Sequence, residues 1–119
     1  MIDAFAREPD GGLIVLPDAT PVVNRGVIIA HASRTRLPAV YPFGFFVRDG
    51  GLMSYRVDAV DRCRQAASYV DRILKGAKAS DLPVQIPTKF ELMINLKTAH
   101  ALGLAFPQEL LLRADEVIQ

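Results

Sequence analysis

The stretch that decides the fold is GLIVLPDATPVVNRGVIIAHASRTRLPAVYP, residues 12–42. Its first apolar run, residues 13–16, is continuous rather than alternating, which is typical of a strand covered on both faces, as in a parallel sheet. A helical segment then extends to about Arg36, and residues 39–41 form a second short apolar strand. Strand, helix and strand in this order predict a βαβ unit with a right-handed crossover.

The predicted helix has signals at both ends. Thr20 is expected to be its N-cap, because a threonine hydroxyl can accept a hydrogen bond from a free backbone N–H. Pro21 suits the first helical position, because proline has no N–H to leave unpaired. Arg34 and Arg36 fall in the last turn, where cations suit the negative end of the helix dipole.

The remaining chain continues the alternation of strands and helices. Glycines and prolines separate the apolar segments, and there is no internal repeat. We therefore predict an α/β fold, with a doubly wound, mostly parallel sheet and flanking helices in a single unit over residues 1–119. The further predicted elements are the end of a helix at 2–8, strands at 52–55 and 90–94, and helices at 58–75, 95–102 and 108–117. In the second of these helices, Asn95 is expected to be the N-cap and Gly103 to end the helix.

Residues 58–75 form the clearest of the predicted helices. Asp58 is expected to be its N-cap, and Gly76 is expected to be the left-handed residue just beyond its end. Apolar residues recur at steps of three and four, which gives the helix one apolar face. This apolar stripe consists of Val60, Cys63, Ala67, Val70 and Leu74.

Charge and composition exclude several classes of protein. The formal net charge is +1 and basic residues are interleaved with acidic ones, so we expect no nucleic-acid partner. The one cysteine excludes an internal disulfide and a cysteine-based zinc site. No apolar run reaches the roughly 18 residues of a membrane span, and residues 1–12 do not show the pattern of a secretory signal.

The sequence shows no recognisable constellation of catalytic residues. His31 and His100 are far apart, fall within predicted helices, and have no second histidine or carboxylate at metal-ligand spacing. Cys63 lies on the apolar stripe, which is typical of a packed thiol. Nucleophile elbows, phosphate-binding loops and dinucleotide fingerprints are all lacking. We therefore expect no enzyme activity, no metal and no cofactor.

Asp18 and Tyr41 occupy the positions at which a fold of this class binds ligands. Open α/β sheets hold ligands beyond the carboxyl ends of their parallel strands. Asp18 follows the first predicted strand and Tyr41 ends the second, so both belong to the same edge of the sheet. Three roles are open for Asp18: helping to cap the next helix, binding a ligand amine or hydroxyl, or acting as a catalytic acid or base.

Tyr55 and the pair Gly50-Gly51 are further candidates. Tyr55 ends a predicted strand shortly before the helix cap Asp58. Its flat ring and polar hydroxyl suit the wall of a ligand cleft, and a buried hinge tyrosine would have the same sequence pattern. The two glycines by themselves indicate a turn.

Three longer stretches carry a family pattern: RLPAVYPFGFFVRDGGLMSYRVD, AASYVDRILKGAKASDLPVQIPTKFELMINLKTAHALGL and LLLRADEVI. They resemble the C-terminal part of ABC-transporter substrate-binding proteins of the tryptophan/tyrosine-transport type. The resemblance implies a type I periplasmic binding protein with two α/β lobes, which holds its ligand between the lobes and delivers it to a membrane permease without catalysis. It also implies a periplasmic location for the full-length protein, of which this chain corresponds to the second half.

The same resemblance points to site residues. The family's aspartate after Leu-Pro or Pro-Thr matches Asp18, and the loop RDGGLMSY matches the segment that forms the cleft and the hinge. The family's usual YGPD reads YRVD here, so Arg56 stands in place of a glycine and Val57 in place of a proline. The expected ligand-binding residues are Asp18, Thr20, Tyr41, Gly50, Gly51 and Tyr55.

Residues 57–85 are expected to pack either on the lobe that this chain lacks or on a second copy. The apolar stripe has no partner of its own, and leaving it open would expose several hundred Å² of apolar surface. We therefore expect a homodimer, formed for example by domain swapping. Two functions follow: the solute-binding component of an ABC-type importer for a small organic solute such as an amino acid, or a truncated structural homodimer that binds no ligand.

Overall fold

The computed structural model describes residue 6 and residues 11–119. The chain divides into two compact units: Met1–Arg56 with Glu91–Gln119, called here the sheet unit, and Val57–Phe90, called the helical unit. The helix end predicted at 2–8 lies outside the described residues, apart from residue 6.

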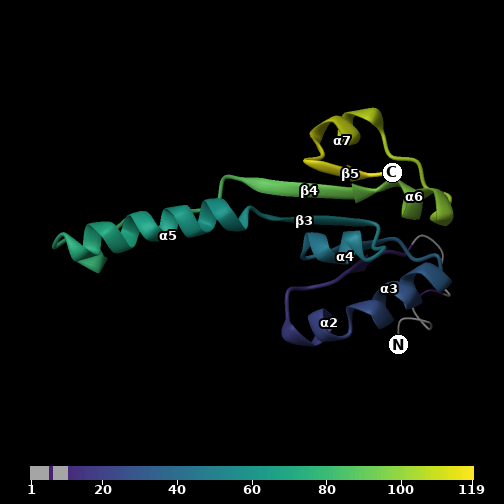
Figure 1. Ribbon diagram of the computed structural model, residues 1–119, viewed down its shortest axis with the longest axis horizontal. Helices are drawn as coiled ribbons and strands as arrows, with labels where there is room; N and C mark the ends of the chain where they lie inside the picture. Colours follow the sequence, from purple (N-terminus) through teal and green to yellow (C-terminus); the bar gives the residue numbers. More distant parts are fainter. Residues whose placement is uncertain (1–5, 7–10) are drawn as a thin grey trace. The chain divides into compact units, whose positions relative to one another are not determined.

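A five-stranded sheet forms the framework of the chain, in the order β1-β2-β3-β4-β5 (Figure 1). β1 pairs with β2, β2 with β3, and β4 with β5, all in parallel. The predicted α/β fold with a mostly parallel sheet is therefore confirmed. The strands are β1 (Leu13–Ile14), β2 (Ala39–Tyr41), β3 (Met53–Val57), β4 (Phe90–Asn95) and β5 (Glu116–Ile118).

One neighbouring pair of strands, β3 and β4, runs antiparallel. The Asn95 N–H donates to the Leu52 carbonyl at 2.9 Å, and Arg56 forms an ion pair with Glu91. Residue numbers rise along one strand while their partners' numbers fall along the other, as antiparallel pairing requires. The arginine that replaces the family's usual glycine thus has a partner across the sheet.

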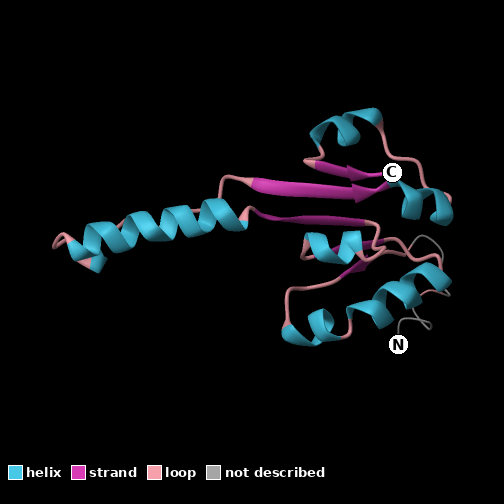
Figure 2. Ribbon diagram, in the orientation of Figure 1, coloured by secondary structure: helices cyan, strands magenta, loops and turns pink. Residues whose placement is uncertain are grey.

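In the part of the chain that the structure describes, six segments are α-helices and one is a short 3₁₀ turn. The helices are drawn in cyan in Figure 2. Helix α5 and helix α6 agree closely with the prediction, and their N-caps Asp58 and Asn95 accept hydrogen bonds from backbone N–H groups as expected. The α-helices are α2 (Ala19–Val23), α3 (Arg25–Arg34), α4 (Gly44–Arg48), α5 (Ala59–Leu74), α6 (Leu96–Leu102) and α7 (Gln108–Arg113), and Ala79–Asp81 is a short 3₁₀ turn.

Three helix predictions need correction. The single helix expected up to Arg36 is two helices, because Asn24 ends α2 and its side-chain amide donates to the Thr20 carbonyl at 2.9 Å. Helix α4 was not predicted. The last helix, expected to reach residue 117, ends at Arg113, because Ala114 is extended and the following residues form strand β5.

The core of the sheet unit lies between α3, α4 and the central strands. Its main cluster joins Ile29 and Ala32 of α3 to Ala39, Tyr41 and Phe46. Phe46 is fully buried, and its ring stacks on that of Tyr41 with 5.1 Å between centroids. The first apolar run is not covered on both faces as expected: Leu13 and Val15 pack against this cluster, whereas Ile14 and Leu16 are 72% and 71% exposed.

The helical unit has a different construction. In α5, Asp58 caps the start by accepting from the N–H groups of Val60 and Asp61 at 2.8 and 3.0 Å. Gly76 follows the end with φ of +101°, a conformation that glycine adopts without strain. No residue of α5 is buried, so this helix is defined by its caps rather than by a core.

Candidate functional site

The carboxyl ends of β1, β2 and β3 are the natural place to look for a binding site in the sheet unit. Because the three strands are parallel, their carboxyl ends meet at one edge of the sheet, called here the carboxyl edge. Asp18 follows β1 and Phe43 follows β2, whereas Tyr55, expected to end its strand, is the middle residue of β3 because that strand continues to Val57. The polar and aromatic groups at this edge are therefore contributed by separate segments of the chain.

Asp18 is the N-cap of α2. Its Oδ1 atom accepts a hydrogen bond from the Thr20 N–H at 2.8 Å, and this bond lowers the pKa of the carboxyl. The predicted capping role of Asp18 is confirmed, whereas Thr20 is not the N-cap but the first-turn residue that donates to it. A carboxylate has two oxygens, so the cap leaves Asp18 able to accept a hydrogen bond from a ligand as well.

Thr20 and Tyr55 are both exposed. Thr20 lies in the first turn of α2, directly beside the Asp18 carboxylate. Tyr55 is 56% exposed, while its neighbour Ser54 is buried, as the alternation of side chains along a strand requires. The alternative of a buried tyrosine is therefore wrong, and the ring of Tyr55 lies on the surface of the sheet unit.

Tyr41 lies in the core. It is 2% exposed, its ring stacks on Phe46, and burial raises its pKa to about 12. Its side chain does not line the surface. Its packing in the core fixes the end of β2, from which the chain enters the loop at Pro42 and Phe43.

Gly51 packs against Tyr41, and Gly50 lies next to Ile29. Gly50 ends α4 with φ of +107°, and the Gly51 N–H donates to the Phe46 carbonyl at 2.8 Å. A Cβ atom at Gly51 would lie 2.7 Å from Cε2 of Tyr41, closer than two such atoms can approach. These glycines therefore allow α4 to close tightly onto the core.

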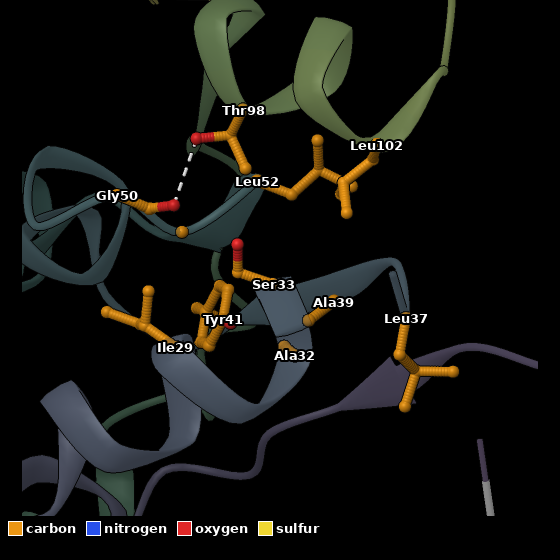
Figure 3. Close-up of a pocket in the computed structure, with 11 residues that line it drawn as sticks. Ile29, Ala32, Ser33, Leu37, Ala39, Tyr41, Gly50, Leu52, Thr98 and Leu102 are labelled. Atoms are coloured by element: carbon orange, nitrogen blue, oxygen red, sulfur yellow. Dashed lines mark hydrogen bonds between the residues drawn. The ribbon is translucent and has the colours of Figure 1, made fainter. Parts of the chain in front are cut away.

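Figure 3 shows this cluster, in which Thr98 of α6 donates to the Gly50 carbonyl at 2.9 Å. A cavity of only about 10 Å³ remains between the side chains, which is space for about one water molecule. The six predicted site residues thus form two groups. Asp18, Thr20 and Tyr55 are exposed, and Tyr41, Gly50 and Gly51 are brought together around this small cavity.

A row of stacked aromatic rings follows β2, and none of its members is among the expected ligand-binding residues. Phe43 stacks on Phe45 at 5.2 Å, and Phe45 on Phe46 at 5.1 Å. The Arg25 guanidinium lies 5.7 Å from the centre of the Phe45 ring, and its Nε atom is 2.6 Å from a carboxylate oxygen of Asp49. The signal in the sequence is PFGFF, directly after a strand.

An apolar hollow lies at the opposite, amino edge of the strands. It has a volume of about 390 Å³ and is lined by apolar residues, among them Leu13, Val40, Met53 and Phe106. No titratable side chain lines it, so it offers no charged group to orient a ligand. Within residues 11–119 there is also no group of three or more His, Cys, Asp or Glu that could hold a metal.

Comparison with known proteins gives the chain a context. The family model described as "ABC transporter substrate binding protein" matches residues 4–118. A search of curated proteins found no match. In the described part of the chain, no helix has the length and apolar character to cross a membrane.

Solved structures resemble the chain closely in fold. A conserved domain protein from Vibrio cholerae has 28% identity and a TM-score of 0.80, with 98% of this chain and 39% of the other covered. An ABC domain in complex with L-Trp from Streptococcus pneumonia has 26% identity and a TM-score of 0.79, with 98% and 40% covered. A ligand-free, open substrate-binding protein from Clostridium difficile has 18% identity and a TM-score of 0.67, with 90% and 36% covered. This chain therefore spans about 40% of the length of the first two.

Proposed function

Because the chain belongs to the family of ABC transporter substrate binding proteins, we propose that it acts as part of the solute-binding component of an ABC-type importer. The component would bind a small organic solute, such as an amino acid, and deliver it to a membrane permease. In its full-length form it would work in the periplasm and would catalyse no reaction.

The position of Asp18 carries the proposal. It is an exposed carboxylate at the carboxyl edge, and the hydrogen bond from the Thr20 N–H keeps its pKa low, so it is ionised at neutral pH. An ionised carboxylate can bind an ammonium group through charge-assisted hydrogen bonds. An amino acid presents such a group.

Two further observations support an amino acid as the solute. The exposed ring of Tyr55 offers a flat surface for the side chain of a ligand. A structural neighbour with 26% identity is a complex with L-Trp. Tyr41, Gly50 and Gly51 would then act by fixing the backbone behind the site.

The affinity expected of this chain is low. A site between two lobes loses about half of its contacts when only one lobe is present, which weakens a micromolar site to roughly millimolar. At a ligand concentration of ten times such a dissociation constant, binding stabilises the folded chain by roughly 1.4 kcal/mol. That raises the melting temperature by several degrees.

A thermal-shift screen of amino acids, with L-tryptophan as the first probe, tests the proposal. We expect at least one amino acid to raise the melting temperature of the chain and to do so much less in Asp18→Asn. Asparagine is as good an N-cap as aspartate, so this variant removes the charge without removing the cap. Asp81→Asn, at an exposed aspartate of the helical unit, is the matched control and should respond as the native chain does. If no amino acid stabilises the chain, or if the Asp18→Asn variant responds fully, the proposal is wrong.

A structural homodimer that binds no ligand is the second candidate function. The observation that favours it is the open apolar stripe of α5, since no residue of that helix is buried. A chain that is dimeric and unaffected by every solute in the screen would support this function over the first.

A further inference from the structure

Strands β3 and β4 lead from the sheet unit into the helical unit and back, and no tight turn sets how they pair. Residues 58–89 lie between the two strands, so the register is not fixed by a short connection as it is in a hairpin. The apolar pattern of β4 does not fix it either. Leu92, Met93 and Ile94 are all buried, so a slip by one residue would still leave an apolar side chain on each face of the strand. Other side chains must therefore specify the register.

Two backbone hydrogen bonds define the observed register. The Asn95 N–H donates to the Leu52 carbonyl at 2.9 Å, and the Asp58 N–H donates to the Lys89 carbonyl at 3.0 Å. Both bonds give the same antiparallel alignment, since six residues separate them along each strand. The two strands are thus paired in one register from the sheet core to the start of α5.

In this register, opposite charges face each other at two neighbouring positions. Arg56 lies directly across from Glu91 and forms an ion pair with it, and their side chains are 32% and 34% exposed. One step further out, the Lys89 ammonium lies 2.9 Å from Oδ2 of Asp58, while Oδ1 of the same carboxylate caps α5. These four residues are called here the charge quartet.

The order of the charges along each strand opposes a slip. Each strand carries a positive and then a negative residue: Arg56 and Asp58 on one, Lys89 and Glu91 on the other. A slip by two residues in one direction would place Arg56 opposite Lys89. A slip in the other direction would place Asp58 opposite Glu91. Like charges directly opposite each other destabilise a strand pair, so both slips replace attraction with repulsion.

We propose that the charge quartet fixes the register of β3 against β4 and thereby positions Tyr55. This residue directly precedes Arg56, and the register places it opposite Leu92, on the other face of the strand pair. The four charged residues are positioning residues, because they hold the backbone that carries the exposed ring. Only the consequence for ligand binding rests on the proposed function, since the register belongs to the chain itself.

Nuclear magnetic resonance reads this register directly. Tyr55 and Leu92 form a non-hydrogen-bonded pair, in which the two Cα atoms are closest, so a strong nuclear Overhauser effect is expected between their Hα atoms. Arg56→Glu places two carboxylates opposite each other. It should reduce this signal by about half and speed solvent exchange of the Asp58 amide about tenfold. A variant that keeps both the native signal and the native exchange rate overturns the proposal.

A charge swap separates the ion pair from the two side chains as such. Arg56→Glu combined with Glu91→Arg restores an attractive pair and should bring the signal and the exchange rate back close to the native values. The charge at position 91 also acts on Arg48, but that guanidinium is paired with Glu116 at 2.7 Å. A swapped chain that behaves no better than Arg56→Glu alone overturns the proposal.

Lys75→Glu is the matched control. It reverses the charge of an exposed ion pair, in which the Lys75 ammonium lies 2.8 Å from the Asp71 carboxylate, at the other end of α5. Both readouts should stay native in this variant. If it changes them as much as Arg56→Glu does, the effect is one of net charge and the proposal is wrong.

The response to a ligand tests whether the register serves the site. The rise in melting temperature caused by an amino acid should be smaller in Arg56→Glu than in the native chain and should return in the swapped chain. A lost Tyr55–Leu92 signal with an undiminished ligand response overturns the positioning role. If no amino acid stabilises the native chain, the proposed function fails, and the resonance experiments still decide whether the charge quartet sets the register.

Discussion

The helices of the sheet unit and the helix of the helical unit have similar apolar content, but the two units differ in whether their apolar side chains are buried. In the sheet unit, Tyr41, Phe46 and Ile94 are removed from water almost completely. In the helical unit, the apolar residues of α5 stay exposed, and the helix is defined by the Asp58 cap and the turn at Gly76.

This difference indicates which contacts stabilise the folded chain. An isolated helix of this length is marginal in water, and most helical stability in proteins comes from packing of the apolar face. The sheet unit already has such packing, whereas no residue of α5 is buried. Substitutions should therefore have large effects on the free energy of unfolding in the first unit and small effects in the second.

The largest effect is expected from Phe46→Ala. Removing a fully buried ring from the Tyr41 stack should lower the free energy of unfolding by about 3–5 kcal/mol. Val70→Ala on the stripe of α5 should change it by less than about 0.5 kcal/mol when the chain is dilute and monomeric. Urea unfolding of the two variants checks the contrast, and equal losses would contradict it.

Gly51→Ala should come next, with a loss of about 1–3 kcal/mol from forced overpacking. The new methyl group would lie 2.7 Å from the Tyr41 ring and 2.8 Å from the Phe46 carbonyl oxygen. Gly26→Ala is the matched control, because nothing lies within 4 Å of that position and it is helical. There we expect a gain of up to about 1 kcal/mol. Should both variants unfold alike, the packing role of Gly51 is wrong.

Tyr41 should make the sheet unit sensitive to alkali. Burial raises its pKa to about 12 in the folded chain, above the ordinary value of 10.0. The stability it contributes is therefore complete below pH 10 and is lost as the pH rises through about 12. Tyr41→Phe should remove this part of the dependence, which near-ultraviolet circular dichroism during an alkaline titration can follow. An unchanged alkaline transition in Tyr41→Phe would show that another group is responsible.

The smallest effect is expected at the Asp58 cap. Hydrogen bonds from the Asp61 N–H and from Lys89 lower the pKa of Asp58 below its ordinary value of 3.8. Because the pKa of Asp58 is lowered in the folded chain, the stability that its carboxylate contributes is complete above about pH 4. That contribution is lost as the pH falls through the folded-state pKa. Helix content by far-ultraviolet circular dichroism should thus decline in acid. In Asp58→Asn the helix content should depend less on pH in this range. A steeper decline in the variant would show that the Asp58 carboxylate is not responsible.

The elements that sequence predicted well are those with local causes. The caps at Asp58 and Asn95 and the glycines at 76 and 103 were found because a side chain or a φ angle decides them within a few residues. Strand β5 was missed because its cause is distant: the Asp115 carboxylate accepts from the Leu92 N–H at 2.8 Å, and Glu116 pairs with Met93.

A distant cause also explains why some of the predicted site residues are exposed and others are buried. Sequence order places Asp18 after β1 and Tyr41 at the end of β2, and both positions are correct. Strand β2 has only three residues, which is too few for an alternating pattern to show which side chains face the core. The local sequence therefore does not show that the Tyr41 ring points into the core. The role of Gly51 could not be predicted either, because the ring that needs its lack of a side chain belongs to Tyr41, ten residues earlier.

The contrast between the two units is tested most directly by amide hydrogen exchange. Protection of the β2 and β4 amides should approach the global stability, because their burial is internal to one chain. Protection of the α5 amides should be much weaker, because no residue of that helix is buried. Protection of α5 that equals that of the core would contradict the account.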